Sequence, residues 1–407
     1  MKICHVITRM IVGGAQENTL ATALGLAARG HEVTLLTGPG TGPEGSLLDV
    51  SGAPSALKGV RLVVEPHLVR PVHPLRDALA LRALEQHFRR ETYDIVHTHS
   101  SKAGIVGRTA AWRARARGAP LIVHTIHGLA FDAFQPWWKN RLFIALERRC
   151  ARHTDALISV CDAMTRQALA AGVGQPAQYQ TIYSGTDFSA YPAAQAARGG
   201  TRALLGCPAD AFVLGFAGRL FALKGAEEFV RIVHAASEAA RAVHGVIIGG
   251  GPLRAQLEAQ ARAWGLGDRM HFTGLVPPEA VPRMLCAADL VVHASLREGL
   301  ARVIVQSLAL GVPVAAYDVG GAREVLVDGE NGIVCAAGDE RGLTARVREA
   351  VADDALRGRL ANGARRTDVS RFDVRRMVGQ IEGLYMRLAA AACPGRQGGV
   401  QSLTDKS

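Results

Sequence analysis

The sequence predicts an α/β protein with two doubly wound, Rossmann-like domains that face a cleft. Short apolar runs alternate with longer helical patterns along most of the 407 residues. The alternation is interrupted near the middle of the chain, where residues 189–200 lose their periodicity and fill with Ala, Gly and Pro. A single hydrophobic core usually stops growing at roughly 250–300 residues, so the length also favours two domains.

The amino-terminal half opens with a βαβ unit. A strand is expected at residues 3–7, a helix at 15–28 that Gly30 ends, and a second strand at 32–36. The further strands of this half are expected at residues 60–64, 95–99, 121–125, 156–160 and 179–183. Helical patterns separate most of these strands, so the sheet should be parallel.

A second series of strands and helices follows residue 200. Its strands are expected at residues 213–217, 246–249, 270–273, 290–293, 314–317 and 333–335. In doubly wound sheets, ligands bind beyond the carboxyl ends of the strands. The cleft between the two domains is therefore the expected ligand site.

These patterns set the domain boundaries. An amino-terminal domain covers residues 1–188, a linker covers 189–200 and a carboxyl-terminal domain covers 201–370. A last helix is expected at residues 371–390, and packing back on the amino-terminal domain is one option for it. Residues 391–407 are rich in Ala, Gly and polar residues, and we expect a disordered tail there.

The composition is that of an ordinary globular protein, with 48% hydrophobic and 20% charged residues. No segment has the roughly 18 apolar residues that a membrane-spanning helix needs. His5, Thr8 and Arg9 interrupt the first apolar run, which argues against a signal peptide. The seven cysteines show no close pair and no metal-ligand spacing. We therefore expect reduced thiols, a cytoplasmic location and no zinc or redox site.

The charge balance indicates a polyanionic partner. The net charge is +11 and the isoelectric point is near 9.7, which leaves nucleic acid, anionic lipid and phosphorylated substrates open. An aromatic content of 5% argues against nucleic acid, since such a site needs aromatic rings on which bases stack.

An anion site is expected at residues 218–225, GRLFALKG, which follow a strand and open a helix. Arg219 suits bidentate contact with phosphate oxygens, and Lys224 supplies a compact charge, as a diphosphate would require. Lys224 is also one of only six lysines in the chain. The alternative is a surface turn whose charges are solvated.

A second polar segment, residues 295–306, also runs from a strand into a helix. The helix is so apolar that it must be buried, so its polar residues need a reason. Arg302 and Gln306 lie four apart on one face, and Glu298 precedes the first turn. The functional interpretation is that Glu298 accepts sugar hydroxyls and Gln306 binds a ribose. The structural alternative is that Glu298 caps the helix dipole and Gln306 is bonded internally.

A histidine-rich cluster is expected at the end of the strand at residues 95–99. His97 and His99 lie two apart and so point to the same side, and Ser101 and Lys102 follow them. We expect this cluster to face an acceptor. Metal ligation is the alternative, but the segment from His97 to Gly104 contains no Asp, Glu or Cys partner.

Several ordered motifs together resemble the retaining family-4 glycosyltransferases, which have the GT-B fold. In the carboxyl-terminal half they are GRLFALKG, VIIGGGPLRAQLEAQARAWGLGDRMHFTG and SLREGLARVIVQSLALGVPVAAYDVGGAREVLVDGENGIV. The amino-terminal half matches more loosely, through GGAQE, HTHSSKAG and HTIHG. These last motifs resemble the subgroup that builds bacterial surface polysaccharides.

The resemblance implies roles for individual residues. Arg219 and Lys224 would bind the donor diphosphate, Glu298 would lie against the transferred sugar, and the backbone at Gly299 and Leu300 would join them. Gln306 stands where the family has a glutamate that holds the ribose. An amide can also bind a diol, although a carboxylate makes stronger bonds.

The remaining implied contacts are less specific. His127, followed by a glycine, matches the histidine that family members place near the donor sugar, and we expect it to position the sugar. The four residues expected to be catalytic are Glu298, His127, Arg219 and Lys224. The additional residues expected on the donor side are Gly14, Gly251, Phe272, Arg302 and Gln306.

The resemblance implies transfer of a sugar from a UDP- or GDP-linked donor to a glycan or lipid-linked acceptor, with retention and with neither metal nor cofactor. A sugar-nucleotide epimerase or hydrolase of the same fold, and a nucleotide-binding protein without transfer activity, are the alternatives. The segment from Trp137 to Arg149 mixes aromatic, aliphatic and basic residues, so it could contact an anionic membrane on the cytoplasmic side. The competing interpretation is a helix that packs on the sheet.

Overall fold

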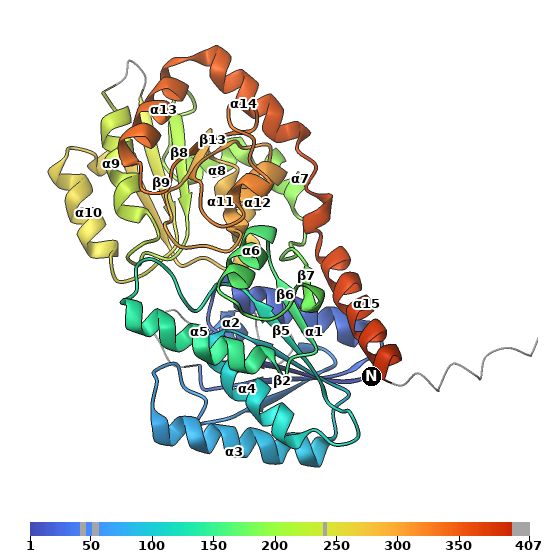
Figure 1. The fold of residues 1–407 in the computed structure, drawn as a ribbon. Helices are drawn as coiled ribbons and strands as arrows, with labels where there is room; N and C mark the ends of the chain where they lie inside the picture. Colours follow the sequence, from blue (N-terminus) through green and yellow to red (C-terminus); the bar gives the residue numbers. More distant parts are fainter. Residues whose placement is uncertain (41–45, 51–56, 239–241, 393–407) are drawn as a thin grey trace, which may run out of the picture.

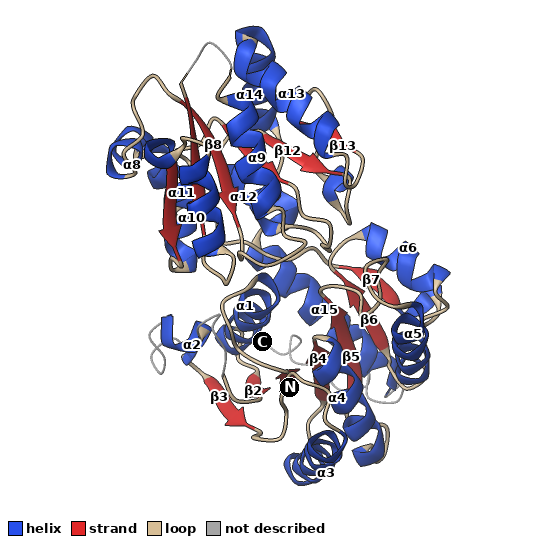
Figure 2. Ribbon diagram, turned by 90° about the vertical axis from the view of Figure 1, so that its left-hand side faces the viewer, coloured by secondary structure: helices blue, strands red, loops and turns tan. Residues whose placement is uncertain are grey.

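The computed structural model describes residues 1–40, 46–50, 57–238 and 242–392. It confirms two α/β domains, each built on a parallel sheet with helices on both faces (Figures 1 and 2). The thirteen strands are β1 (Lys2–Ile7), β2 (Glu32–Thr37), β3 (Val60–Val64), β4 (Ile95–His99), β5 (Leu121–Ile126), β6 (Ala156–Ser159), β7 (Tyr179–Thr181), β8 (Phe212–Ala217), β9 (Val243–Ile248), β10 (Met270–Gly274), β11 (Leu290–His293), β12 (Val314–Tyr317) and β13 (Gly332–Cys335).

The two sheets repeat one strand order. The amino-terminal sheet runs β3-β2-β1-β4-β5-β6-β7, and the carboxyl-terminal sheet runs β10-β9-β8-β11-β12-β13. In each, the order reverses beside the first strand, between β1 and β4 and between β8 and β11. Such a reversal opens a crevice at the carboxyl ends of the strands, where doubly wound sheets bind their ligands.

Helices cover both faces of each sheet (Figure 2). The longer ones are α1 (Gly14–Ala28), α3 (Pro74–Glu91), α4 (Ser101–Ala114), α5 (Trp137–Ala151), α6 (Asp162–Ala170), α9 (Ala226–Ala236), α10 (Arg254–Ala263), α12 (Arg302–Ala309), α13 (Glu340–Ala352), α14 (Asp354–Arg366) and α15 (Val374–Ala392). The short ones are α2 (Leu47–Val50), η2 (Pro176–Gln178), α7 (Tyr191–Ala196), α8 (Arg198–Leu204), η3 (Gly267–Arg269), η4 (Pro278–Ala280), α11 (Val281–Leu285), η5 (Ala322–Glu324) and η6 (Ser370–Phe372).

The segment expected as an irregular linker is helical. Residues 189–200 contain α7 and the start of α8, and Tyr191 and Ala194 are buried in the core of the carboxyl-terminal domain. The prediction rested on the lost periodicity and on the Ala, Gly and Pro content, but Pro192 lies in the first turn of α7, where its missing N–H has no cost. The alanines around it favour a helix.

The last helix returns to the amino-terminal domain (Figure 1). Helix α15 packs on α1, where Asn18 donates to the Met377 sulfur at 3.1 Å and Arg29 pairs with Glu382 at 2.5 Å. The chain therefore crosses between the domains twice. The crossings lie side by side, because the Thr186 N–H donates to the Phe372 carbonyl at 2.8 Å.

Two further observations complete the fold. The expected disordered tail at residues 391–407 lies almost entirely outside the described residues; only its first two residues are described, and they end α15. Among the helices that the structure describes, none is long and apolar enough to cross a membrane.

Candidate active site

A cleft of about 1290 Å³ lies between the domains at the carboxyl ends of both sheets. Of the residues predicted from the sequence, those that line it are Gly14, Ser101, His127, Arg219, Lys224, Glu298, Gly299, Leu300, Arg302 and Gln306. The structure thus brings together residues from both halves of the chain, at the place that the strand order predicts.

Lys224 and Glu298 form an ion pair in the wall of the cleft, with 2.6 Å between Nζ and Oε1. Lys224 lies in the turn between β8 and α9, and Glu298 lies in the loop after β11. Gly225 brings the two segments together, because it has φ +83° and a Cβ there would lie 2.5 Å from the Ala294 carbonyl carbon. No other residue fits this turn without moving the loop.

The electrostatics of Glu298 depend on a histidine that the sequence did not single out. His293, the last residue of β11, is buried, and its Nε2 lies 3.6 Å from the Glu298 Oε1 without a hydrogen-bond partner. Burial acts to raise the pKa of Glu298, but the neighbouring Lys224 and His293 outweigh it and lower that pKa. Glu298 is therefore a carboxylate at neutral pH, ready to accept hydrogen bonds.

Arg219 lies on the same wall. Its guanidinium is 5.5 Å from the centre of the Phe221 ring, a cation–π distance. Together with Lys224 it places two cations at the loop where α9 begins. The three side chains therefore present two positive charges and one negative charge to the cleft.

The domains touch each other across the cleft through ion pairs. Arg302 pairs with Glu17 of α1, and Arg297 pairs with Asp132 at 2.9 Å. In this structure the charge of Arg302 is directed at the opposite domain. Its binding to the donor stays a prediction, since Arg302 also lines the cleft. Neither carboxylate was singled out in the sequence, since each pair joins residues more than 160 positions apart.

The backbone at Gly299 is also part of this contact. A Cβ on Gly299 would lie 2.9 Å from the His127 carbonyl oxygen and 2.7 Å from the Met164 sulfur. Glycine at this position therefore lets the Glu298 loop approach the amino-terminal domain.

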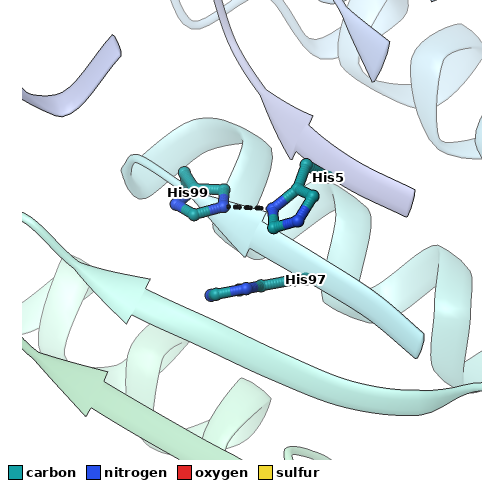
Figure 3. A group of neighbouring side chains, drawn as sticks. All are labelled: His5, His97 and His99. Atoms are coloured by element: carbon teal, nitrogen blue, oxygen red, sulfur yellow. Dashed lines mark hydrogen bonds between the residues drawn. The ribbon is translucent and has the colours of Figure 1, made fainter. Parts of the chain in front are cut away.

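The prediction that His97 and His99 face an acceptor is wrong. Both side chains have no exposed surface. His97 lies against α15, with its Nδ1 2.5 Å from the Tyr385 hydroxyl, and Figure 3 shows His97 and His99 grouped with His5. Lys102 is also occupied, because it pairs with Asp77 at 2.5 Å. The prediction that His97 and His99 point to the same side of β4 was correct. The sequence did not indicate that the last helix would cover this side of the sheet.

His127 takes the place at the cleft that His99 was expected to share. It is half-buried, lines the cleft, and its Nε2 is 3.0 Å from the Nδ1 of His99. Burial lowers the pKa of His127 to about 4, so the ring is neutral at neutral pH.

Two predicted donor residues lie off the cleft. Gly251 lies against the Leu220 carbonyl, and Phe272 packs against the core of the carboxyl-terminal domain. Leu275 and Val276 line the cleft in this region instead.

Two groups of potential metal ligands occur among the described residues, and both lie outside the cleft. They are His5 with His97 and His99, and Cys207 with His244 and His271. The second group shows the limit of judging metal sites by sequence spacing, since its residues come from the loop before β8, from β9 and from β10. The six cysteines that the structure describes are all free and buried.

Comparison with known proteins gives the family. The family model described as "Glycosyl transferases group 1" matches residues 201–367, and the "Glycosyl transferase 4-like domain" matches residues 13–185. A D-inositol 3-phosphate glycosyltransferase of Mycolicibacterium paratuberculosis is 31% identical over 351 residues, covering 80% of this chain and 75% of that protein.

Two further relatives cover nearly the whole chain. The UDP-Gal:alpha-D-GlcNAc-diphosphoundecaprenol alpha-1,3-galactosyltransferase of Escherichia coli is 28% identical, over 95% of this chain and 97% of its own length. The structure of Anabaena HepE in complex with UDP and glucose superposes with a TM-score of 0.76 at 23% identity, covering 95% of this chain and 99% of HepE. The matched models span both domains and the fold agrees, so the chain belongs to the group 1 glycosyltransferases, the family-4 enzymes with the GT-B fold.

Proposed function

We propose that this enzyme transfers a sugar from a UDP-sugar, with retention and without a metal, to a lipid-linked acceptor at a membrane surface. The observation that carries the proposal is the Lys224–Glu298 pair, which places a cation for a diphosphate beside a carboxylate for sugar hydroxyls. The pair faces a cleft whose opposite wall belongs to the other domain. A donor held on one wall would therefore meet an acceptor on the other.

The charges of the cleft suit the departure of a nucleoside diphosphate. Lys224 and Arg219 would neutralise the negative charge that develops on the diphosphate as the glycosidic bond breaks. Glu298 would lose its bond to Lys224 as that cation turns to the phosphate, and would then accept from the sugar hydroxyls. His293 remains beside Glu298 in this state, 3.6 Å away, and would limit the cost of the buried charge.

The carboxylates of the cleft support retention without a covalent intermediate. Among its described lining residues, three carry carboxylates, and each is held in an ion pair: Glu17 with Arg302, Asp132 with Arg297, and Glu298 with Lys224. Glu17 and Asp132 stay in their ion pairs, and Glu298, once Lys224 has turned to the phosphate, would be engaged by the sugar hydroxyls. The acceptor would therefore attack from the face that the diphosphate leaves. The same pairing supports metal independence, since Mg²⁺ binding would need free carboxylate oxygens.

The donor and acceptor classes are taken from the relatives. The Escherichia coli relative is named for UDP-Gal and a diphosphoundecaprenol acceptor, and HepE was solved with UDP and glucose. We therefore favour UDP over GDP as the donor nucleotide, and a polyprenyl diphosphate sugar as the acceptor in surface polysaccharide assembly.

The surface of α5 supports contact with a membrane. Trp137, Trp138 and Leu142 are 71%, 53% and 51% exposed, which argues against a helix that only packs on its sheet. Lys139 and Arg141 lie over the two indole rings. Exposed indoles beside cations suit the interface of an anionic bilayer, where a cytoplasmic enzyme would meet a lipid-linked acceptor.

The activity is tested by incubating the enzyme with a panel of UDP- and GDP-sugars and a polyprenyl diphosphate N-acetylglucosamine acceptor. We expect one UDP-sugar to be consumed only with the acceptor present, and the Glu298→Gln variant to lose transfer. Glu349→Gln, an exposed change on α13, is the matched control and should keep full activity. Conversion of the donor without acceptor would indicate an epimerase or hydrolase instead, and nucleotide binding without transfer would indicate a binding protein.

The membrane contact is tested by flotation with vesicles. We expect binding to vesicles with anionic lipid, a weaker association with zwitterionic ones, and a loss of about tenfold on replacing Trp137 and Trp138 by Ser. Leu204→Ser is the matched control, because Leu204 is 68% exposed on α8 of the other domain. Equal binding of both variants would contradict a contact through α5.

A further inference from the structure

A chain of histidines runs from the core of the amino-terminal domain to the cleft. The His5 Nδ1 lies 3.0 Å from the His99 Nε2, and the His99 Nδ1 lies 3.0 Å from the His127 Nε2. Figure 3 shows the first of these bonds, between β1 and β4. At its inner end, the His5 Nε2 is buried and has no hydrogen-bond partner, while at its outer end His127 lines the cleft.

The three rings are neutral. Burial lowers the pKa of His5 to about 3 and that of His127 to about 4, and holds the pKa of His99 well below its usual range. A neutral imidazole has one N–H and one bare nitrogen. Each bond in the chain therefore needs one protonated and one bare nitrogen, so the tautomers of all three rings are linked.

Only two arrangements satisfy both bonds. In one, His5 donates to His99, His99 donates to His127, and the His5 Nε2 is bare. In the other, every proton is reversed, and the His5 Nε2 carries an N–H that is buried with no acceptor. A buried donor without a partner costs roughly 1–3 kcal/mol, and such N–H groups are rarer in proteins than under-bonded acceptors. The first arrangement is therefore favoured.

His97 contacts the histidine chain but is not one of its hydrogen-bonded members. Its ring contacts that of His99 in a tilted arrangement, with 4.3 Å between centroids. The Nδ1 of His97 is 2.5 Å from the Tyr385 hydroxyl and its Nε2 is 2.7 Å from the Thr125 hydroxyl. With both nitrogens of His97 bonded, His5, His97 and His99 do not offer three free ligands to one metal ion. The group is better explained by proton placement than by metal binding.

We infer that His5 and His99 are positioning residues that fix His127 as its Nδ1–H tautomer. No hydrogen bond is seen from the Nδ1 of His127 to the described residues, and this atom is not among the buried unbonded ones. His127 would therefore present a hydrogen-bond donor to an oxygen atom of the ligand, a sugar hydroxyl or a phosphate oxygen. The identity of that ligand rests on the proposed function, whereas the tautomer does not.

The tautomer can be measured without any substrate. In protein labelled with ¹⁵N-histidine, two-bond ¹H–¹⁵N correlation distinguishes a protonated ring nitrogen from a bare one, and comparison with His127→Asn identifies the His127 signals. We expect Nδ1 protonated and Nε2 bare in His127 at pH 7. A protonated Nε2 on His127 would overturn the inference, whether alone or together with a protonated Nδ1.

Two substitutions at His5 separate positioning from packing. His5→Asp places a hydrogen-bond acceptor at the inner end, so His99 should donate from its Nε2, His127 should change to the Nε2–H tautomer and kcat/KM should fall about tenfold. His5→Asn keeps an amide N–H near the position of Nδ1 and should preserve both the single tautomer and the activity within about twofold. A single Nδ1–H tautomer in His5→Asp would show that His5 has no such role.

The outcomes also separate this inference from the proposed function. If the expected tautomer is found but no sugar is transferred, the proposed function fails and the histidine chain stands. If transfer is found with the reversed tautomer, the proposed function stands and the histidine chain fails.

Discussion

The two domains share one strand order but offer opposite chemistry at the ends of their strands. In the carboxyl-terminal domain, the loops after β8 and β11 carry charged side chains, Lys224 and Glu298, that pair with each other in the cleft. In the amino-terminal domain, β4 and β5 end in neutral histidines. The comparison shows that the doubly wound fold fixes where a ligand lies and leaves the chemistry of each wall to a few loop residues.

The difference matches the two halves of the proposed reaction. A diphosphate needs fixed positive charge, which Arg219 and Lys224 supply on the carboxyl-terminal wall, here called the charged wall. A sugar and its acceptor hydroxyl are neutral, so the neutral histidine region of the amino-terminal domain, here called the neutral wall, can orient them by hydrogen bonds. The Glu17 and Asp132 carboxylates of that domain are held in ion pairs with the opposite domain. Substitutions on the two walls should therefore have different consequences.

The largest effect is expected from the charged wall. Lys224→Ala should lower kcat by roughly 10²- to 10³-fold, because it removes a cation from the site where charge develops. His127→Ala, on the neutral wall, should lower it by only about tenfold, the value of one hydrogen bond between neutral groups. Steady-state kinetics with the best UDP-sugar measures both. Equal losses would contradict the division between the walls.

Lowering the pH should destabilise the amino-terminal domain through its buried neutral histidines. The folded pKa of His5 is lowered to about 3 by burial, while an unfolded histidine titrates near 6.5. Below pH 6.5 the unfolded chain binds a proton that the folded domain cannot bind, so stability is lost as the pH falls from 6.5 toward 3. Between pH 7 and pH 5, His5 alone should cost about 2 kcal/mol.

Urea unfolding at the two pH values checks this expectation. The free energy of unfolding of His5→Asn should depend less on pH than that of the wild type. His73→Asn serves as the control, because His73 is exposed and asparagine can also cap α3. An unchanged pH dependence in His5→Asn would show that His5 does not contribute.

A smaller effect is expected from the ion pair that joins the walls. Glu17→Gln and Arg302→Gln should each reduce kcat a few-fold, and the double variant should be no worse than either, with a coupling near 1 kcal/mol. Nucleotide affinity should change little in Glu17→Gln, since Glu17 belongs to the opposite domain. Fully additive losses in kcat would mean that the pair does not hold the closed cleft.

The smallest effect is expected at Gln306, which lines the cleft on the charged wall. Gln306→Glu should change the KM for the donor less than about threefold, because both side chains can bind a ribose diol. Calorimetric titration with UDP compares nucleotide binding by the wild type and Gln306→Glu without turnover. A loss of tenfold or more would show that the neutral amide is required.

Much of the fold could be predicted from the sequence. All thirteen strands were expected within about three residues, because buried parallel strands are short apolar runs between helical patterns. The prediction of an irregular linker was wrong, because the segment forms α7. A proline is compatible with a helix only in its first turn, so the role of Pro192 depends on where α7 begins. The sequence also predicted that the cleft lies at the carboxyl ends of the strands of both sheets.

The site could be predicted only where its chemistry is local. Lys224 and Glu298 each lie in a strand-to-helix turn with a recognisable pattern, and both line the cleft. The partners that complete the site, such as Glu17 and His293, come from elements whose contacts depend on packing. The prediction that His97 faces an acceptor was wrong for the same reason, because α15 returns from the far end of the chain and covers this side chain.

That return of α15 has a consequence for how the protein is made. The core of the amino-terminal domain includes Met377, Ile381 and Tyr385, which pack against β1 and α1. Domains usually fold in order as they leave the ribosome, the first one before the second is synthesised. Here the first domain lacks part of its core until α15 has been translated, so that core is completed only after the second domain has been synthesised. The order of synthesis and the order of folding are therefore not the same.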